Sequence, residues 1–223
     1  PVGRHRINIC VKGCHADQRM ARYAGELFVA LLKQQGMTVG GYGGVRPVSA
    51  QARLVHTHSS RPDLREISRS TLMYSSNFMA NLIFLACGAK QFGYPATWSK
   101  ARQAVRQQLA LQIGHQAESI VQVEGAGLAR ENRVTAKAML RLLEVFRPHS
   151  GLLRKEQEVA LKTGTLTDVY TLAGFLPGGE AFVILLNQPA NNRAAVLARI
   201  KQQWSSGRRA HNRASVDGEM SGK

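Results

Sequence analysis

Apolar residues recur at helical spacing along most of the chain. Side chains three or four positions apart on an apolar face predict amphipathic helices, and residues typical of caps, such as Thr135 at the start of one segment and Gly36 after another, mark their ends. The predicted helices cover Asp17 to Gln35, Pro62 to Leu72, Phe78 to Ala86, Thr97 to Gln112, Thr135 to Phe146, and Asn192 to Trp204.

The pattern changes to short apolar runs after residue 150, which is typical of strands. Strands are predicted at 159–163, 169–176 and 181–187, with the last two joined through Pro177-Gly178-Gly179 as a hairpin. A further strand is predicted at 52–58. Apolar and polar residues alternate weakly over residues 1–14, which suggests another strand there.

Length and composition fit a soluble globular protein. The chain has 223 residues, of which 44% are hydrophobic and 20% charged, so it can bury the core of one domain and part of a second. Its longest apolar run, Phe182 to Leu186, is far shorter than a membrane span. Residues 205–223 are polar and rich in Gly, Ser and Arg, and we expect a disordered basic tail there.

The charge balance favours polyanionic partners. Lys and Arg total 30 against 14 Asp and Glu, a net charge of +16, which suits nucleic acid, acidic wall polymers or anionic membrane surfaces. No helix carries the basic residues with interleaved aromatics as a nucleic-acid groove would, so we expect no nucleic-acid partner.

The cysteines do not form a disulfide framework, because Cys10, Cys14 and Cys87 make an odd number. Cys10-x-x-x-Cys14-His15 admits a metal site, yet a zinc site needs a fourth ligand and only the loose His56-x-His58 is available. A strand and turn with incidental or oxidised thiols is the alternative that we favour, and we expect no metal or cofactor.

One short stretch, Lys162-Thr163-Gly164-Thr165, combines a cation, two hydroxyls and a missing side chain at the end of an apolar run. A partly desolvated ammonium beside hydroxyls suits a carboxylate, and Gly164 leaves room for a ligand along the strand. The alternative is that this stretch is an ordinary turn that happens to contain Lys and Gly.

A second stretch, Ser75-Ser76-Asn77, lies between two predicted helices. Ser and Asn side chains commonly cap a helix, and that explanation suffices for the stretch alone. Three polar residues at such a junction also suit a catalytic site.

A third stretch begins at Glu124-Gly125-Ala126-Gly127 and continues to Thr135. The order and spacing of the three stretches resemble those of penicillin-binding serine D-Ala-D-Ala carboxypeptidases of the type-four group, peptidase family S13. The resemblance runs from about Ala16 to Trp204. It implies acyl transfer by a serine in an S-x-x-K motif and hydrolysis by water. It also implies peptidoglycan stem peptides as substrates, beta-lactams as inhibitors, and a periplasmic or cell-envelope location.

The resemblance assigns roles to the residues of both stretches. Ser75 would relay protons to the leaving amine, Asn77 would hold the peptide carbonyl, and Lys162 would supply positive potential. Thr163 and Thr165 would contact the terminal carboxylate, with Gly164 between them and the Thr165 N–H as half of the oxyanion hole.

The chain departs from the family pattern in three places. No serine is followed three positions later by lysine, so we expect the nucleophile segment upstream of Pro1. The first residue is Pro1 and not Met, which suggests that the N-terminus was processed or trimmed. Glu124-Gly125-Ala126-Gly127 replaces D-G-S-G, which loses a hydroxyl and is expected to loosen the loop. Asp168 adds a negative charge near the carboxylate site.

The resemblance predicts an α/β (α+β) fold, in which an antiparallel sheet built from the 52–58 strand and the late strands is covered by terminal helices on one side and a helical lobe, 60–148, on the other. Residues 1–50 would end an inserted region, 51–204 would form the carboxypeptidase domain, and 205–223 the tail. The function favoured is a serine-type carboxypeptidase or endopeptidase that lacks its nucleophile in this chain. The alternative is a non-catalytic relative that binds the cell wall through its charge.

Overall fold

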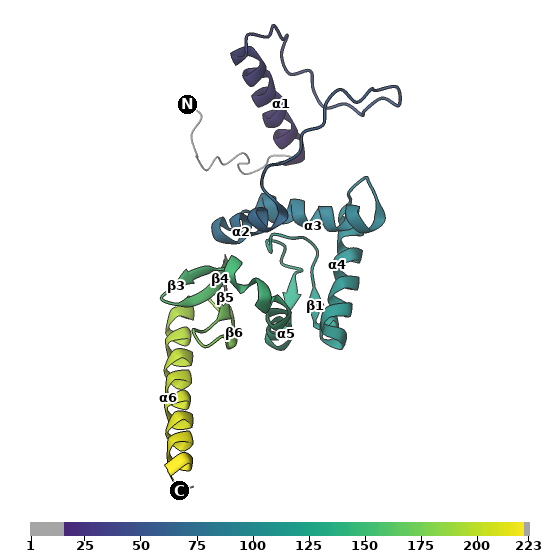
Figure 1. Cartoon of the computed structure of the whole chain (residues 1–223). Coiled ribbons are helices and arrows are strands. Elements are labelled where there is room, and N and C mark those ends of the chain that lie inside the picture. The colour runs from purple at the N-terminus through teal and green to yellow at the C-terminus, as the bar shows by residue number, and fades with distance from the viewer. Residues whose placement is uncertain (1–15, 221–223) are drawn as a thin grey trace. The chain divides into compact units, whose positions relative to one another are not determined.

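The computed structural model describes residues 16–220 and divides the chain into two compact units, 1–59 and 60–223. Figure 1 shows the elements of each unit, which are described separately below. The predicted division into an inserted region over 1–50 and a main domain over 51–204 stays a prediction.

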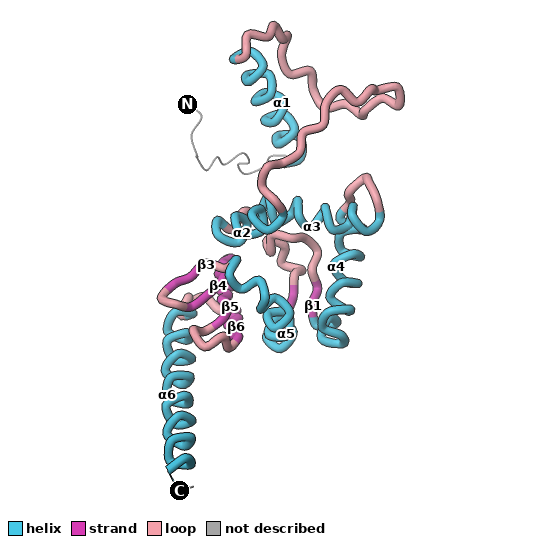
Figure 2. The backbone as a smooth tube through the Cα atoms, in the orientation of Figure 1, coloured by secondary structure: helices cyan, strands magenta, loops and turns pink. Residues whose placement is uncertain are grey.

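The described residues of the first unit, 16–59, form one helix and a long connection. Helix α1 spans Ala16–Gln34, which confirms the predicted helix, and Figure 2 draws the chain that follows it as loop up to α2. The strand predicted at 52–58 is wrong: its side chains are exposed and no described strand pairs with it. An extended segment becomes a strand only where a neighbour takes its backbone hydrogen bonds. The strand predicted within residues 1–14 lies outside the described part.

Four α-helices open the second unit, and each is preceded by a residue whose side chain caps it. Asp63, Ser76, Thr97 and Thr135 accept backbone N–H groups of the first turns at the helix starts. The helices and two short 3₁₀ segments are α2 (Leu64–Tyr74), α3 (Asn77–Phe92), α4 (Trp98–Ile113), η1 (Gly114–Ser119), α5 (Ala136–Phe146) and η2 (Arg147–Leu152).

The main sheet is antiparallel with the order β3-β4-β5-β6, and a two-residue pair, β1 (Ile120–Val121) with β2 (Arg133–Val134), closes the loop before α5. Its strands are β3 (Arg154–Glu156), β4 (Val159–Leu166), β5 (Val169–Phe175) and β6 (Ala181–Asn187). The three longer strands and the β5–β6 hairpin were predicted; β3 was not. Because β3 pairs with β4 only up to Leu161, no described strand covers that edge of β4 from Lys162 onward.

The sheet is buried on both faces. On one face, Val159 and Leu161 of β4 lie in a cluster against which α6 packs Val196, Leu197, Ile200 and Trp204. On the other face, Ala160 lies in a cluster with residues of α5 and with Leu72 of α2. Figure 1 shows the sheet between α6 and α5. The prediction of helices on both faces is confirmed for these helices.

Helix α6 spans Arg193–Met220, well past the predicted end at Trp204. The disordered tail predicted from 205 therefore differs from the structure up to Met220. No proline interrupts residues 193–220, so the backbone hydrogen bonds continue beyond the turns that pack on the sheet. None of the described helices is both long and apolar enough to span a membrane.

Candidate active site at the open edge of strand β4

The structure brings Lys162 and Ser75 together, although 87 positions separate them in sequence. The Lys162 Nζ donates to Ser75 Oγ at 2.5 Å and to the carbonyl oxygen of Thr163 at 2.7 Å. Strand alternation explains the meeting, because Lys162 shares a face of β4 with Ala160. Ala160 belongs to the cluster that Leu72 joins, three residues before Ser75 on α2.

The two serines at the junction between α2 and α3 make different hydrogen bonds. Ser76 caps α3, where its Oγ accepts the Met79 N–H at 3.3 Å. Ser75 ends α2 in the left-handed region, with φ 50° and ψ 49°, and its N–H bonds to the Thr71 carbonyl. The cap explanation therefore holds for Ser76, and it leaves the Ser75 hydroxyl for Lys162.

The direction of the hydrogen bonds follows from the chemistry of the groups. An ammonium has only donors, so Ser75 Oγ accepts from Lys162. The hydroxyl hydrogen of Ser75 is then free to point at a third group. A hydroxyl that accepts from a cation and donates onward is suited to passing a proton.

The remaining residues of the Lys162 stretch lie along the open edge of β4. Gly164 faces Thr171 across the β4–β5 ladder, and a Cβ built on Gly164 would lie 2.4 Å from Thr171 Oγ1. The glycine thus has a packing reason besides the room for a ligand that the sequence suggested. Thr165 Oγ1 accepts a hydrogen bond from Arg193 Nη1 at 2.9 Å.

Arg193 is a residue of this site that the sequence interpretation did not include. It is the first residue of α6, and its Nη1 also donates to the Gly164 carbonyl at 2.9 Å. It lies 28 positions after Thr165, in a helix start that matches no motif. The apolar spacing predicted the helix and the resemblance predicted that it covers the sheet, and only that packing could have pointed to Arg193.

The electrostatics of the site are set by two cations. Partial burial lowers the pKa of Lys162, and the positive charge of Arg193 lowers it further. The ion pairs among the described residues involve neither group. Two like charges within interaction range, without a carboxylate partner, favour the binding of an anion.

Asn77, the third residue of the junction, is the first residue of α3 and is exposed. Asn77 is near Ser75 because only Ser76 separates them in sequence. Among the described residues its side chain has no hydrogen-bond partner, so the structure shows no contact between Asn77 and Lys162. Asn81, one turn later, points inward instead: its Oδ1 accepts the N–H groups of Gly125 at 2.7 Å and Ala126 at 3.0 Å.

The loop that begins at Glu124 is tied together by that residue's carboxylate. The carboxylate oxygens accept from the N–H groups of Ala126, Leu128 and Ala129 and from Asn132 Nδ2, at 2.6 to 3.3 Å. The expectation that this loop is loosened is therefore not met.

The end of this loop also contacts the turn that follows the Lys162 stretch. Arg130 Nη2 donates to the Thr167 carbonyl at 2.9 Å, in the turn between β4 and β5. Asp168 follows in the same turn with φ 59° and is exposed. Its predicted effect on the carboxylate site stays a prediction.

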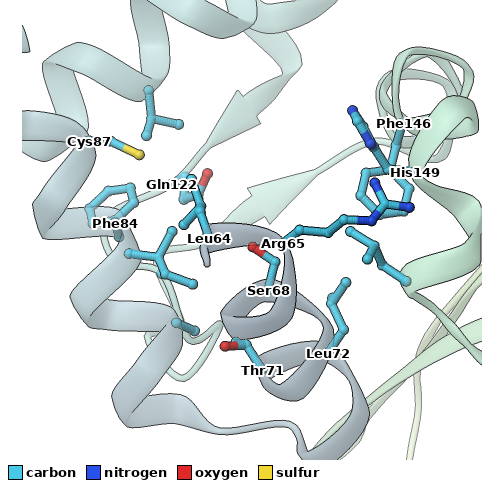
Figure 3. A pocket seen from close by; sticks show the side chains of 15 residues that line it. Leu64, Arg65, Ser68, Thr71, Leu72, Phe84, Cys87, Gln122, Phe146 and His149 are labelled. Carbon is cyan, nitrogen blue, oxygen red and sulfur yellow. The ribbon is translucent and has the colours of Figure 1, made fainter. Parts of the chain in front are cut away.

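A pocket of about 620 Å³ lies apart from Ser75 and Lys162, between α2, α3, α4, the end of α5 and η2. Figure 3 shows it with Arg65 reaching toward His149 and with Cys87 on the opposite wall. Its lining is chiefly apolar and includes neither Ser75 nor Lys162, so it is not the candidate carboxylate site. The other thiols, Cys10 and Cys14, lie outside the described residues together with His15.

Comparison with known proteins gives a family and relatives. A family model described as the D-Ala-D-Ala carboxypeptidase 3 (S13) family matches residues 9–154, a range that includes the Ser75 junction and ends before Lys162. The D-alanyl-D-alanine carboxypeptidase DacB of Haemophilus influenzae is 28% identical over 216 residues, which cover 79% of this chain and 45% of the relative. A D-alanyl-D-alanine carboxypeptidase of an Actinomadura species is 30% identical over 200 residues, covering 75% and 37%.

Solved structures show the same likeness in the fold. Penicillin binding protein 4 of Haemophilus influenzae, complexed with a novel beta-lactam, superposes with a TM-score of 0.62 at 24% identity, over 76% of this chain and 45% of that one. Another structure of that protein gives a TM-score of 0.60 at 25% identity, over 76% and 43%. The chain thus spans less than half the length of the relatives it matches.

Proposed function

The chain belongs to the S13 family of D-Ala-D-Ala carboxypeptidases, and on this premise we propose that it supplies part of the active site of a serine-type D-Ala-D-Ala carboxypeptidase or endopeptidase. The substrates are peptidoglycan stem peptides, which places the protein in the periplasm or cell envelope. The observation that carries the proposal is the contact between Lys162 Nζ and Ser75 Oγ.

The proposed reaction transfers an acyl group to a serine and then to water. The nucleophile's oxygen bonds to the penultimate D-Ala carbonyl carbon, the C–N bond breaks, and the departing D-Ala takes a proton on its amine. Water then cleaves the ester and restores the serine. No serine of this sequence is followed at the third position by lysine. In the proposed scheme, a segment outside this sequence therefore supplies the nucleophile.

Ser75 and Lys162 fit the proton transfers of this scheme. Ser75 accepts from Lys162 and can donate its own hydrogen to the leaving nitrogen, after which Lys162 returns a proton. The lowered pKa of Lys162 makes that return easier than from an ordinary lysine. Asn77, exposed beside Ser75, would hold the substrate's peptide carbonyl.

The open edge of β4 fits the other end of the substrate. A peptide can lie along it from Lys162 onward, with its terminal carboxylate toward the hydroxyls of Thr163 and Thr165. The Thr165 N–H would form half of the oxyanion hole, worth about 3 to 4 kcal/mol of transition-state stabilisation in other enzymes.

Labelling with a fluorescent penicillin tests the proposal. The longer protein that carries the nucleophile segment is expected to form a covalent adduct, while this chain alone takes none. Ser75→Ala and Lys162→Ala are each expected to slow labelling of the longer protein at least about a hundredfold, the usual size of a lost proton-transfer group. Ser99→Ala and Lys155→Ala, at exposed positions, are the matched controls.

Two results would contradict the proposal. Labelling of this chain by itself would show that its nucleophile is not missing. Labelling of the longer protein at an unchanged rate in both site variants would remove Ser75 and Lys162 from the chemistry. A longer protein that takes no label and binds walls with a steep salt dependence, unchanged by Lys162→Ala, would support the non-catalytic alternative.

A further inference from the structure

Two cations reach the Thr163–Thr165 segment from different sides of the sheet. Lys162 lies on the face that packs on α2 and α5, whereas Arg193 comes from α6, which packs on the other face. The Arg193 charge acts on Lys162, and no described carboxylate pairs with either group. Positive charge is therefore concentrated at the open edge of β4 without an internal counter-ion.

The hydrogen bonds of Arg193 leave most of its guanidinium available. Both of its hydrogen bonds within the described residues use Nη1, to the Gly164 carbonyl and to Thr165 Oγ1. The N–H groups of Nε and Nη2 have no acceptor there. A guanidinium has five N–H donors in a planar fork, so a flat anion can still be bound by two of them.

The contact with Thr165 also orients the hydroxyl. Since the oxygen accepts from Arg193, the hydroxyl hydrogen of Thr165 points elsewhere and can be donated to a ligand. The same arrangement holds for Ser75, whose oxygen accepts from Lys162. Each cation thus holds one hydroxyl ready to donate.

We propose that Arg193 is a substrate-binding residue, which takes the C-terminal carboxylate of the substrate together with the Thr165 hydroxyl at the open edge of β4. The assignment rests on the proposed function, because the ligand it names is the acyl-D-Ala-D-Ala terminus. Arginine binds carboxylates through paired, charge-assisted hydrogen bonds, which lysine cannot form in the same plane.

A purely structural role explains less of the arrangement. A neutral donor at position 193 could tie α6 to the Gly164 carbonyl just as well, without placing a second positive charge near Lys162. That repulsion disfavours the charged form of Lys162 in the free protein. A bound carboxylate relieves it, so the arrangement favours a site for an anion over a simple link between elements.

The test compares two ligands on this chain. N-acetyl-D-Ala-D-Ala and its C-terminal amide are titrated while the backbone amides of Thr163 to Thr165 are followed by NMR. The wild-type chain is expected to prefer the acid. Arg193→Gln should weaken binding of the acid about tenfold, as expected for one charge-assisted pair. It should leave binding of the amide unchanged.

Two further variants separate charge from structure. Arg199→Gln removes the same charge from an exposed position of α6 and should leave both affinities unchanged. Arg193→Lys keeps the charge and should retain part of the preference for the acid. An Arg193→Gln chain that loses affinity for acid and amide alike, or for neither, would overturn the assignment.

The outcome is independent of the penicillin experiment. If the longer protein takes no label but the Arg193-dependent preference for the acid is present, the proposed enzyme fails and the carboxylate site stands. If the wild-type chain shows no preference for the acid, the assignment of Arg193 is overturned even where labelling succeeds.

Discussion

The substitution Glu124→Gln tests how much the carboxylate of Glu124 contributes to the stability of the loop from 124 to 132. In the folded protein, Oε2 accepts the Ala126 N–H at 2.7 Å, and Oε1 accepts from Leu128 at 2.8 Å and from the Asn132 side chain at 2.6 Å. Glutamine has the same shape and keeps one acceptor oxygen. Its amide nitrogen would face the Ala126 N–H, so that one hydrogen bond and the charge are lost.

The size of the effect follows from these contacts. A hydrogen bond to a charged group contributes about 1.5 to 3 kcal/mol, and the partial exposure of Glu124 favours the low end of that range. Ala126 keeps a second acceptor in Asn81 Oδ1 at 3.0 Å, which softens the loss further. We expect Glu124→Gln to lower the free energy of unfolding by about 1 kcal/mol, and Glu124→Ala, which removes every acceptor, by about 3 kcal/mol.

The pH dependence gives this prediction its sign. Partial burial raises the pKa of Glu124, but the hydrogen bonds from Ala126, Ala129, Asn132 and Leu128 outweigh burial, so that its pKa is lower than the ordinary 4.5. A carboxyl with a depressed pKa stabilises the fold above its unfolded pKa, and this contribution is lost as the pH falls through the folded value. The difference between wild type and Glu124→Gln should therefore be full at pH 7 and should close below pH 4.5.

Urea unfolding followed by circular dichroism at several pH values measures both quantities. Glu118→Gln is the matched control, because Glu118 is exposed on η1 and has no hydrogen bond or ion pair within the described residues. The reasoning fails if Glu124→Gln costs no more than Glu118→Gln at pH 7. It fails equally if the difference between them persists unchanged well below pH 4.5.

Three further predictions concern the site itself. Gly164→Ala should lower the free energy of unfolding by about 1 to 2 kcal/mol through the contact with Thr171 Oγ1, and Thr171→Ala should restore most of the loss in a double-mutant cycle. The pKa of Lys162, measured by NMR of its side chain, should lie below the ordinary 10.5 and should rise in Arg193→Gln; an unchanged value would refute the coupling. Since the unfolded state holds that proton more tightly, the Lys162 contribution to stability should increase as the pH rises through the folded pKa toward 10.5. Ser75→Gly should be about 1 kcal/mol more stable than Ser75→Ala in urea unfolding, because only glycine adopts φ 50° without a steric cost; equal stabilities would contradict this.

The helices could be predicted because their signals are local. Asp63 accepts the Glu66 N–H at 2.8 Å while the Glu66 carboxylate accepts the Asp63 N–H at 3.2 Å, so four consecutive residues fix the start of α2. Strands depend on partners that lie elsewhere. The 52–58 segment has strand-like residues but no described partner, and β3 exists because Arg154 pairs with Leu161.

The candidate site divides in the same way. Lys162 and Ser75 could be predicted to meet because each belongs to a motif with a fixed chemical task, and the motifs were found in the expected order. Arg193 belongs to no motif, and its place at the site comes from the packing of α6 on the sheet. The role of Glu124 could not be predicted. The sequence shows that Glu124 stands where the family pattern has Asp, but it does not show which backbone N–H groups the longer side chain reaches.

The backbone at Ser75 gives an argument for function that is independent of the family. A left-handed residue at a helix end is where glycine fits best, and serine there costs about 1 kcal/mol. The neighbouring Ser76 already caps the next helix, so stability alone does not call for a hydroxyl at Ser75. The one contact that uses this hydroxyl within the described residues is the hydrogen bond from Lys162. Strain at a polar residue that meets a partly buried cation favours a chemical role for the pair over a structural one.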